Sequence, residues 1–161
     1  MPAAELRPPG ELAALMRKEK AKGVTITVAN GCFSLFHVGH VRYLRAAARL
    51  ADRLVVAINS DRSISRIKGP GKMILDQEAR TTILRSFEFV DYVTVFDQDT
   101  VDDLLWKIQP DFHCKGGGYS TPRQVPEYQT VKSYGGKTVI VGGEKAHSTT
   151  ALIGKIRKTG G

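Results

Sequence analysis

The amino-acid sequence predicts a single α/β domain with a five-stranded, mostly parallel sheet and helices on both of its faces. Short runs of β-branched residues alternate with longer helix-like runs, which is typical of parallel βαβ units. Residues 53–58 are almost wholly apolar, as in a strand that is covered on both faces. The 161 residues are enough for one domain with a substantial buried core.

Five segments rich in β-branched and apolar residues are the predicted strands. In chain order they are residues 24–29, 53–58, 92–96, 111–114 and 137–141. They indicate an open, Rossmann-like sheet, in which ligands bind beyond the carboxyl ends of the strands, where the strand order reverses. The segments that directly follow the strands are therefore the first places to look for a site.

Helices are predicted from apolar residues at helical spacing and from residues that favour helix ends. In chain order they are a helix after Pro8-Pro9 with Leu12, Leu15 and Met16 on one face, a helix with Val41, Leu44, Ala48 and Ala51, a helix over 77–86 capped by Asp76, a helix over 101–108 capped by Thr100, and a helix from Ser148 through Ile156. Because no repeat or linker divides the chain, residues 1–161 are expected to form one domain, in which residues 1–23 lead through the first helix into the first strand.

The charge and the aromatic content of the chain restrict the kinds of molecule that it is expected to bind. The chain carries 24 Lys+Arg and 16 Asp+Glu, a formal charge of +8, which favours polyanions such as nucleic acid, lipid headgroups or phosphorylated small molecules. Aromatic residues make up only 7%, and the basic residues are not gathered on one helix, so nucleic-acid binding is not expected. With no apolar run of about 20 residues and no signal sequence, we expect a cytoplasmic protein without membrane contact, whose Cys32 and Cys114 are reduced thiols.

The turn after the first strand is the most unusual segment. His37 and His40 flank Gly39 just where a helix is expected to begin. Free backbone N–H groups and the helix dipole favour an anion at such a position, so a phosphate is the natural ligand. Zinc is the alternative, but Cys32 and the two histidines lack a second ligand pair at finger-like spacing, and no protein-bound metal is predicted.

Glycine, lysine and hydroxyl clusters follow three of the other strands. They are Asn59-Ser60-Asp61 with the loop Lys68-Gly69-Pro70-Gly71-Lys72, then Lys115-Gly116-Gly117-Gly118-Tyr119, and Gly142-Gly143 with Ser148-Thr149-Thr150. Each alone could be a solvated turn, a flexible loop or a helix cap. Because all are expected at one edge of the sheet, together they predict a site for a nucleoside triphosphate.

Several of these segments resemble a known family. The run from Gly31 to His40 resembles the HxGH signature of the nucleotidyltransferase superfamily, in its cytidylyltransferase-like branch. Further segments resemble, in order, the heptose 1-phosphate adenylyltransferases: Asn30-Gly31-Cys32-Phe33, Val41-Arg42-Tyr43-Leu44, Asn59-Ser60-Asp61, Lys68-Gly69-Pro70-Gly71, Val90-Asp91-Tyr92-Val93, Phe96-Asp97-Gln98-Asp99-Thr100, Pro110-Asp111, Lys115-Gly116-Gly117, Gly135-Gly136 and Ser148-Thr149-Thr150-Ala151-Leu152-Ile153.

The resemblance implies an enzyme that transfers AMP from ATP, with Mg²⁺, to D-glycero-β-D-manno-heptose 1-phosphate. The products are pyrophosphate and ADP-heptose for lipopolysaccharide, and a homo-oligomer, a dimer or larger, is implied. His37 and His40 would stabilise the charge on the phosphates, and Lys68 would neutralise the triphosphate or the attacking sugar phosphate.

The resemblance also assigns the remaining site residues. Nucleotide binding falls to Asn30, Gly31, Cys32, Phe33, Gly39, Lys115, Gly116, Gly117, Ser148, Thr149 and Thr150. Sugar-phosphate binding falls to Asn59, Asp61, Lys72 and Arg80.

Two positions depart from the family pattern, because Ser34 and Gly118 stand where aspartates are usual. A nucleotide-binding homologue with impaired catalysis is therefore one alternative. A glycerol 3-phosphate cytidylyltransferase is the other, although residues 142–144 read Gly-Gly-Glu where an Arg-Thr pair would be expected.

Overall fold

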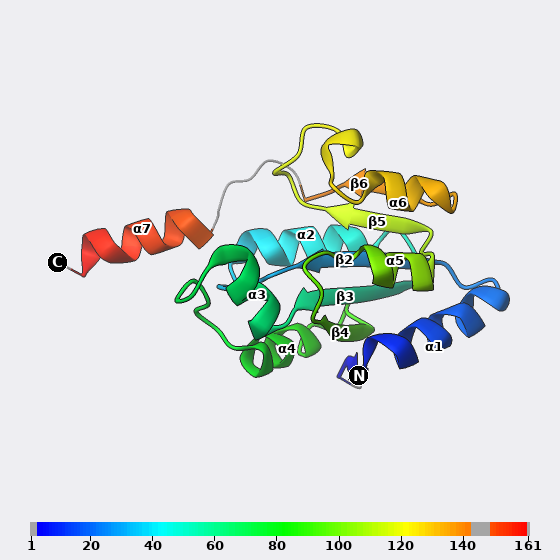
Figure 1. Cartoon of the computed structure of the whole chain (residues 1–161), viewed down its shortest axis with the longest axis horizontal. Coiled ribbons are helices and arrows are strands. Elements are labelled where there is room, and N and C mark those ends of the chain that lie inside the picture. The colour runs from blue at the N-terminus through cyan, green and yellow to red at the C-terminus, as the bar shows by residue number, and fades with distance from the viewer. Residues whose placement is uncertain (1–2, 143–148, 161) are drawn as a thin grey trace.

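A computed structural model describes residues 3–142 and 149–160. In this part of the chain, six strands form one sheet in the order β1-β4-β3-β2-β5-β6, and every neighbouring pair is parallel (Figure 1). The strands are β1 (Glu5–Leu6), β2 (Ile26–Gly31), β3 (Arg53–Asn59), β4 (Tyr92–Phe96), β5 (Phe112–Lys115) and β6 (Lys137–Ile140). The predicted α/β class and parallel sheet are confirmed.

The expected number of five strands is wrong by one. The additional strand, β1, pairs with the edge strand β4 through Glu5↔Tyr92 and Leu6↔Val93. Two residues are too short to show an alternating pattern, so only the pairing itself reveals this strand.

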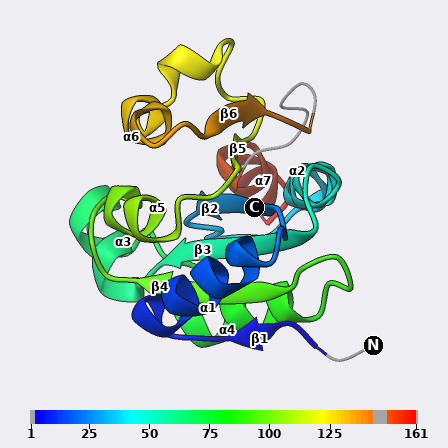
Figure 2. The same cartoon turned by 90° about the vertical axis from the view of Figure 1, so that its right-hand side faces the viewer.

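The helices cover both faces of the sheet (Figure 2). They are α1 (Pro9–Ala21), α2 (Val38–Ala48), α3 (Asp61–Lys68), α4 (Gln77–Arg85), α5 (Asp102–Ile108), α6 (Tyr128–Ser133) and α7 (Thr149–Thr159), with a 3₁₀ turn, η1 (Pro122–Gln124). Buried residues of α1, α5 and α6 join one core cluster, and those of α2 and α4 join the other. Helix α7 projects from the body (Figure 1), and none of the described helices is long and apolar enough to cross a membrane.

Two of the predicted helix caps can be compared with the structure. Asp76 caps α4 as predicted, since its side chain accepts a hydrogen bond from the Ala79 N–H. The cap at Thr100 is wrong, because α5 begins one residue later, after Val101, with no side-chain cap. Ser148, the expected start of the last helix, lies outside the described residues.

The strand order reverses between β2 and β5. From β2 the chain adds β3 and β4 on one side, then returns to place β5 and β6 on the other. A crevice forms at such a point beyond the carboxyl ends of the strands, because the two connections leave in opposite directions. The ends of β2 and β5 therefore mark the expected position of a ligand.

Candidate active site

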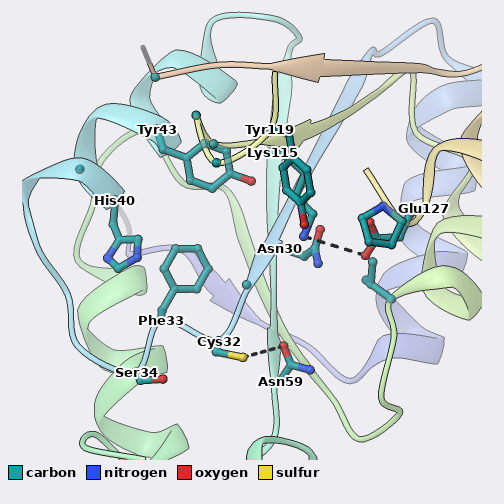
Figure 3. Close-up of a pocket in the computed structure, with 18 of the residues that line it drawn as sticks. Asn30, Cys32, Phe33, Ser34, His40, Tyr43, Asn59, Lys115, Tyr119 and Glu127 are labelled. Carbon is teal, nitrogen blue, oxygen red and sulfur yellow. Dashed lines mark hydrogen bonds and ion pairs between the residues drawn. The ribbon is translucent and has the colours of Figure 1, made fainter. Parts of the chain in front are cut away.

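A cavity of about 660 Å³ lies at this reversal point, a size suited to a small-molecule ligand (Figure 3). It brings together most of the site residues predicted from the sequence. Those that line it are Asn30, Gly31, Cys32, Phe33, His37, Gly39, His40, Asn59, Lys68, Lys115, Gly116, Gly117 and Thr150.

The two histidines form the N-terminus of α2. His37 is the N-cap, and its Nδ1 accepts a hydrogen bond from the Gly39 N–H at 3.1 Å, while His40 Nδ1 accepts one from the His37 N–H at 3.3 Å. A neutral imidazole that accepts at Nδ1 carries its proton on Nε2. Each ring therefore has a hydrogen-bond donor at Nε2, in the positive field of a helix N-terminus.

An aromatic cluster supports the histidines. The His37 and His40 rings stack with centroids 3.8 Å apart, and Phe33 meets the His40 ring edge-on at 4.9 Å. Phe33 is buried at the unusual backbone angle φ 50°. A Cβ at Gly31 would approach this ring to 3.2 Å, so a residue without a side chain suits the end of β2.

Arg80 lies beneath the cavity and not on its wall. Its guanidinium is fully buried and donates to the carbonyl oxygens of Cys32 and Asn59 at 2.8 and 2.7 Å, and to the Asp61 carboxylate at 2.7 Å. It therefore joins the carboxyl ends of β2 and β3. Asp61 is the partner of Arg80, Lys72 is exposed in the following loop, and neither lines the cavity.

The end of β3 supplies one polar wall. The Cys32 thiol donates to Asn59 Oδ1 at 3.5 Å, and the Asn59 amide donates to the Ser63 hydroxyl at 3.0 Å. Lys68, the last residue of α3, is exposed and reaches the same cavity. Gly69 ends the helix at φ 89°, a conformation that favours glycine.

Strand β5 supplies the opposite wall. His113 is fully buried, and its Nε2 lies 2.7 Å from Asn30 Oδ1. Burial lowers the pKa of His113 to about 3, so the neutral ring donates this bond and leaves the Asn30 amide nitrogen as a donor. Two residues further along the strand, burial also lowers the pKa of Lys115, and the charge of Glu127 opposes this effect.

The end of β6 packs closely on α2. A Cβ at Gly142 would lie only 3.0 Å from Tyr43 Cα, and Gly142 has φ 89°. The Tyr43 hydroxyl donates to the Cys114 carbonyl at 2.6 Å, and burial raises the pKa of this tyrosine well above its ordinary value. Thr150 of α7 completes the wall, and Thr149 is the first residue of that helix.

Sequence reasoning missed several residues of the cavity wall. They are Arg42, Tyr43, Asp99, Thr100 and Glu127. Tyr119, which belongs to the predicted cluster after β5, and the two family departures, Ser34 and Gly118, also line the cavity. Ser34 Oγ and Glu127 Oε2 are buried and have no hydrogen-bond partner among the described residues. No pattern in the sequence marked Glu127, because the short helix α6 that follows it buries only Val131.

Fold and site together define an α/β protein with a cavity at the N-terminus of α2, a position whose backbone N–H groups and helix dipole favour an anion. The profile of the family described as cytidylyltransferase-like matches residues 28–155, and the chain belongs to this family. It is thus a nucleotidyltransferase, as the HxGH run indicated.

Individual curated proteins are similar to most of the chain. The chain is 43% identical over 142 residues to the "Bifunctional protein HldE" of Syntrophotalea carbinolica, covering 88% of this chain and 29% of that protein. For the protein of the same name from Hahella chejuensis, identity is 45% over 148 residues, covering 92% and 31%. The chain thus spans about three tenths of the length of these relatives.

A solved structure shares the fold. The lipopolysaccharide core biosynthesis protein of Thermoplasma volcanium GSS1 superposes with a TM-score of 0.63 at 24% identity, covering 74% of this chain and 97% of that one.

Proposed function

We propose that the protein is an adenylyltransferase that transfers AMP from ATP to a sugar 1-phosphate, D-glycero-β-D-manno-heptose 1-phosphate, to give ADP-heptose and pyrophosphate. The observation that carries this proposal is the pair of histidines at the N-terminus of α2, both accepting at Nδ1 on the wall of a nucleotide-sized cavity. The sequence resemblance to heptose 1-phosphate adenylyltransferases supports the choice of sugar.

The reaction needs no protein nucleophile. A phosphate oxygen of the sugar 1-phosphate attacks the α-phosphorus of ATP, a new P–O bond forms, and the bond from the α-phosphorus to the bridging oxygen breaks. Pyrophosphate leaves with the electron pair of that bond. Because both reactants are anions, the protein contributes by positioning them and by stabilising charge.

The cavity residues take roles that follow from their chemistry. His37 and His40 donate from Nε2 to phosphate oxygens as negative charge develops on the leaving pyrophosphate. Lys68 reaches the same phosphates from α3 and neutralises charge. Asn30, Lys115 and the glycines after β5 bind the nucleotide, whereas Asn59 lies on the side of the sugar phosphate. Arg80 acts indirectly, by holding the strand ends that carry these groups.

Magnesium enters this scheme with the nucleotide. Among residues 3–142 and 149–160, no three His, Cys, Asp or Glu side chains lie close enough to share a metal ion. Mg²⁺ commonly keeps several waters and binds through substrate phosphates, so MgATP is the proposed substrate.

The direct test is pyrophosphate release from purified protein with ATP, Mg²⁺ and D-glycero-β-D-manno-heptose 1-phosphate. We expect turnover with this pair and much less with CTP and glycerol 3-phosphate. Preference for the second pair would overturn the proposed substrates in favour of a cytidylyltransferase.

Tight ATP binding in calorimetry without turnover would instead favour a nucleotide-binding homologue with impaired catalysis. In that case Ser34→Asp with Gly118→Asp should restore activity. Position 118 can accept a side chain, because nothing lies within 4 Å of a Cβ built there.

A further inference from the structure

Glu127 is a buried carboxylate on the cavity wall with very few partners. It is only 6% exposed and directly precedes α6. Its Oε1 lies 3.9 Å from Lys115 Nζ, beyond hydrogen-bond distance, and its Oε2 has no hydrogen-bond partner within the described chain. Burial of a carboxylate is unfavourable unless donors replace its lost water, so a ligand that supplies a donor would complete this site.

The cavity is electrostatically asymmetric. The N-terminus of α2, with His37 and His40, favours negative charge at one side. Glu127 lies across the cavity from His40, next to Lys115 and Tyr119 (Figure 3). A phosphate would be repelled by this carboxylate, so the phosphates belong at α2 and an uncharged part of the ligand belongs at Glu127.

The ion pair with Lys115 restricts the kind of donor that Glu127 can accept. One carboxylate oxygen already faces an ammonium group, so the local charge is largely balanced and a second cation is not required. A neutral donor is enough for Oε2, because a carboxylate only accepts hydrogen bonds. Sugar hydroxyls are the most abundant neutral donors on a nucleotide or a sugar phosphate.

We propose that Glu127 Oε2 accepts a hydrogen bond from a sugar hydroxyl of the bound substrates and makes this end of the cavity selective for a hydroxylated sugar. This inference rests on the proposed function. Both substrates carry such hydroxyls: one set is on the ribose of the nucleotide and the other is on the sugar of the acceptor phosphate. The experiment below separates them.

Calorimetric titrations measure how affinity responds when single hydroxyls are removed. The nucleotide arm compares ATP with 2′-deoxy-ATP, 3′-deoxy-ATP and an analogue that lacks the 6-amino group, each with Mg²⁺ and without acceptor. The acceptor arm compares mannose 1-phosphate with its deoxy analogues in the presence of α,β-methylene-ATP. Both arms use the wild type, Glu127→Gln and the control Glu88→Gln, which alters an exposed glutamate outside the cavity.

In the wild type, removal of the hydroxyl that Glu127 contacts should lower affinity about 10- to 100-fold, as expected for a hydrogen bond to a charged acceptor. In Glu127→Gln, whose amide oxygen is an uncharged and weaker acceptor, the same removal should cost at least about 5-fold less than in the wild type, and Glu88→Gln should behave as the wild type. A coupled loss in the nucleotide arm assigns the contact to ribose, and one in the acceptor arm assigns it to the second sugar.

Equal responses of wild type and Glu127→Gln in both arms would overturn the inference, as would coupling to the 6-amino group alone. Circular dichroism checks that Glu127→Gln folds. If it does not fold, Glu127→Asp takes its place, and wild-type protein that binds all deoxy analogues as tightly as their parents overturns the inference by itself. Failure to bind any nucleotide overturns the proposed function and this inference together, whereas binding without coupling overturns only the inference.

Discussion

The two ring nitrogens of His37 have different roles. Its Nδ1 caps α2 by accepting from the Gly39 N–H, and its Nε2 carries the proton proposed to face the phosphates. Asparagine can replace the helix cap, because its side-chain oxygen is a good N-cap acceptor, but it has no donor in the place of Nε2.

We expect His37→Ala to lower the free energy of unfolding by about 1 kcal/mol and His37→Asn to leave it nearly unchanged. Both variants should lose about 10²- to 10³-fold in turnover, the usual effect of removing a transition-state donor. Urea unfolding and pyrophosphate release measure the two effects. Equal stability of the two variants would contradict the cap, and near-normal turnover of His37→Asn would remove this residue from the chemistry.

His113 should make the stability of the protein depend on pH. Its pKa is about 3 in the folded protein against an ordinary value of 6.5, so the unfolded chain takes up the proton first as the pH falls. Stability is therefore complete above about pH 6.5 and is lost progressively towards pH 3. Between pH 8 and pH 5 this one group should cost about 2 kcal/mol.

The matched variant is His113→Gln, which can still donate to Asn30 but does not titrate. The difference in unfolding free energy between wild type and variant should change by this amount over the same pH range, because other groups cancel. If the unfolding free energies of the two proteins change in parallel with pH, the pKa of His113 is not lowered by burial in the folded protein.

The site was only partly predictable from single residues. The HxGH run could be found because its spacing has a direct physical meaning at the start of a helix. Glu127 could not, because its burial depends on how the loop after β5 folds back over the sheet. The contact of His113 with Asn30 likewise depends on the register of β2 against β5, which pairs Val28 with His113 and is not visible in a linear pattern.

Among the secondary-structure elements, predictability followed length and apolar content. The strands with β-branched runs were found, and β1 was not. Helix α3 was missed because it buries only Ser63 and Ile64, so it lacks an apolar stripe of helical spacing. Helix α6 spans six residues and has one buried residue, Val131, which is too little to define a face.

The junction of β6 with α2 gives a test of close packing between elements. Gly142→Ala would force a side chain into a positive-φ position and into Tyr43, and should destabilise the protein by about 1–3 kcal/mol. Gly118→Ala is the control, since its Cβ meets nothing and its φ lies outside the left-handed region, and it should be neutral or slightly stabilising. Chemical denaturation measures both, and equal effects would argue against the close contact.

The net charge of the whole protein does not say where anions bind. If nucleotide binds in the cavity, however, it should stabilise the folded protein by a predictable amount. MgATP at about 100 times its dissociation constant should raise the unfolding free energy by about 2.7 kcal/mol. The increase should shrink with added salt, because Lys68 is exposed and its attraction is screened. Thermal unfolding in ATP and in a short DNA duplex of equal phosphate concentration measures this, and greater stabilisation by DNA would contradict a mononucleotide site.

The wholly parallel sheet has a consequence for how the protein folds. Parallel neighbours cannot be joined by a tight hairpin, so each pairing must close a long crossover before its contacts form. Folding is therefore expected to be slow for a chain of this length, since loop closure precedes the energetic gain. The cavity collects residues from the ends of β2, β3 and β5 and from α7, so it cannot form before these three strands have paired and α7 is in place. Nucleotide would then bind only the completed fold, and it would slow unfolding without accelerating folding.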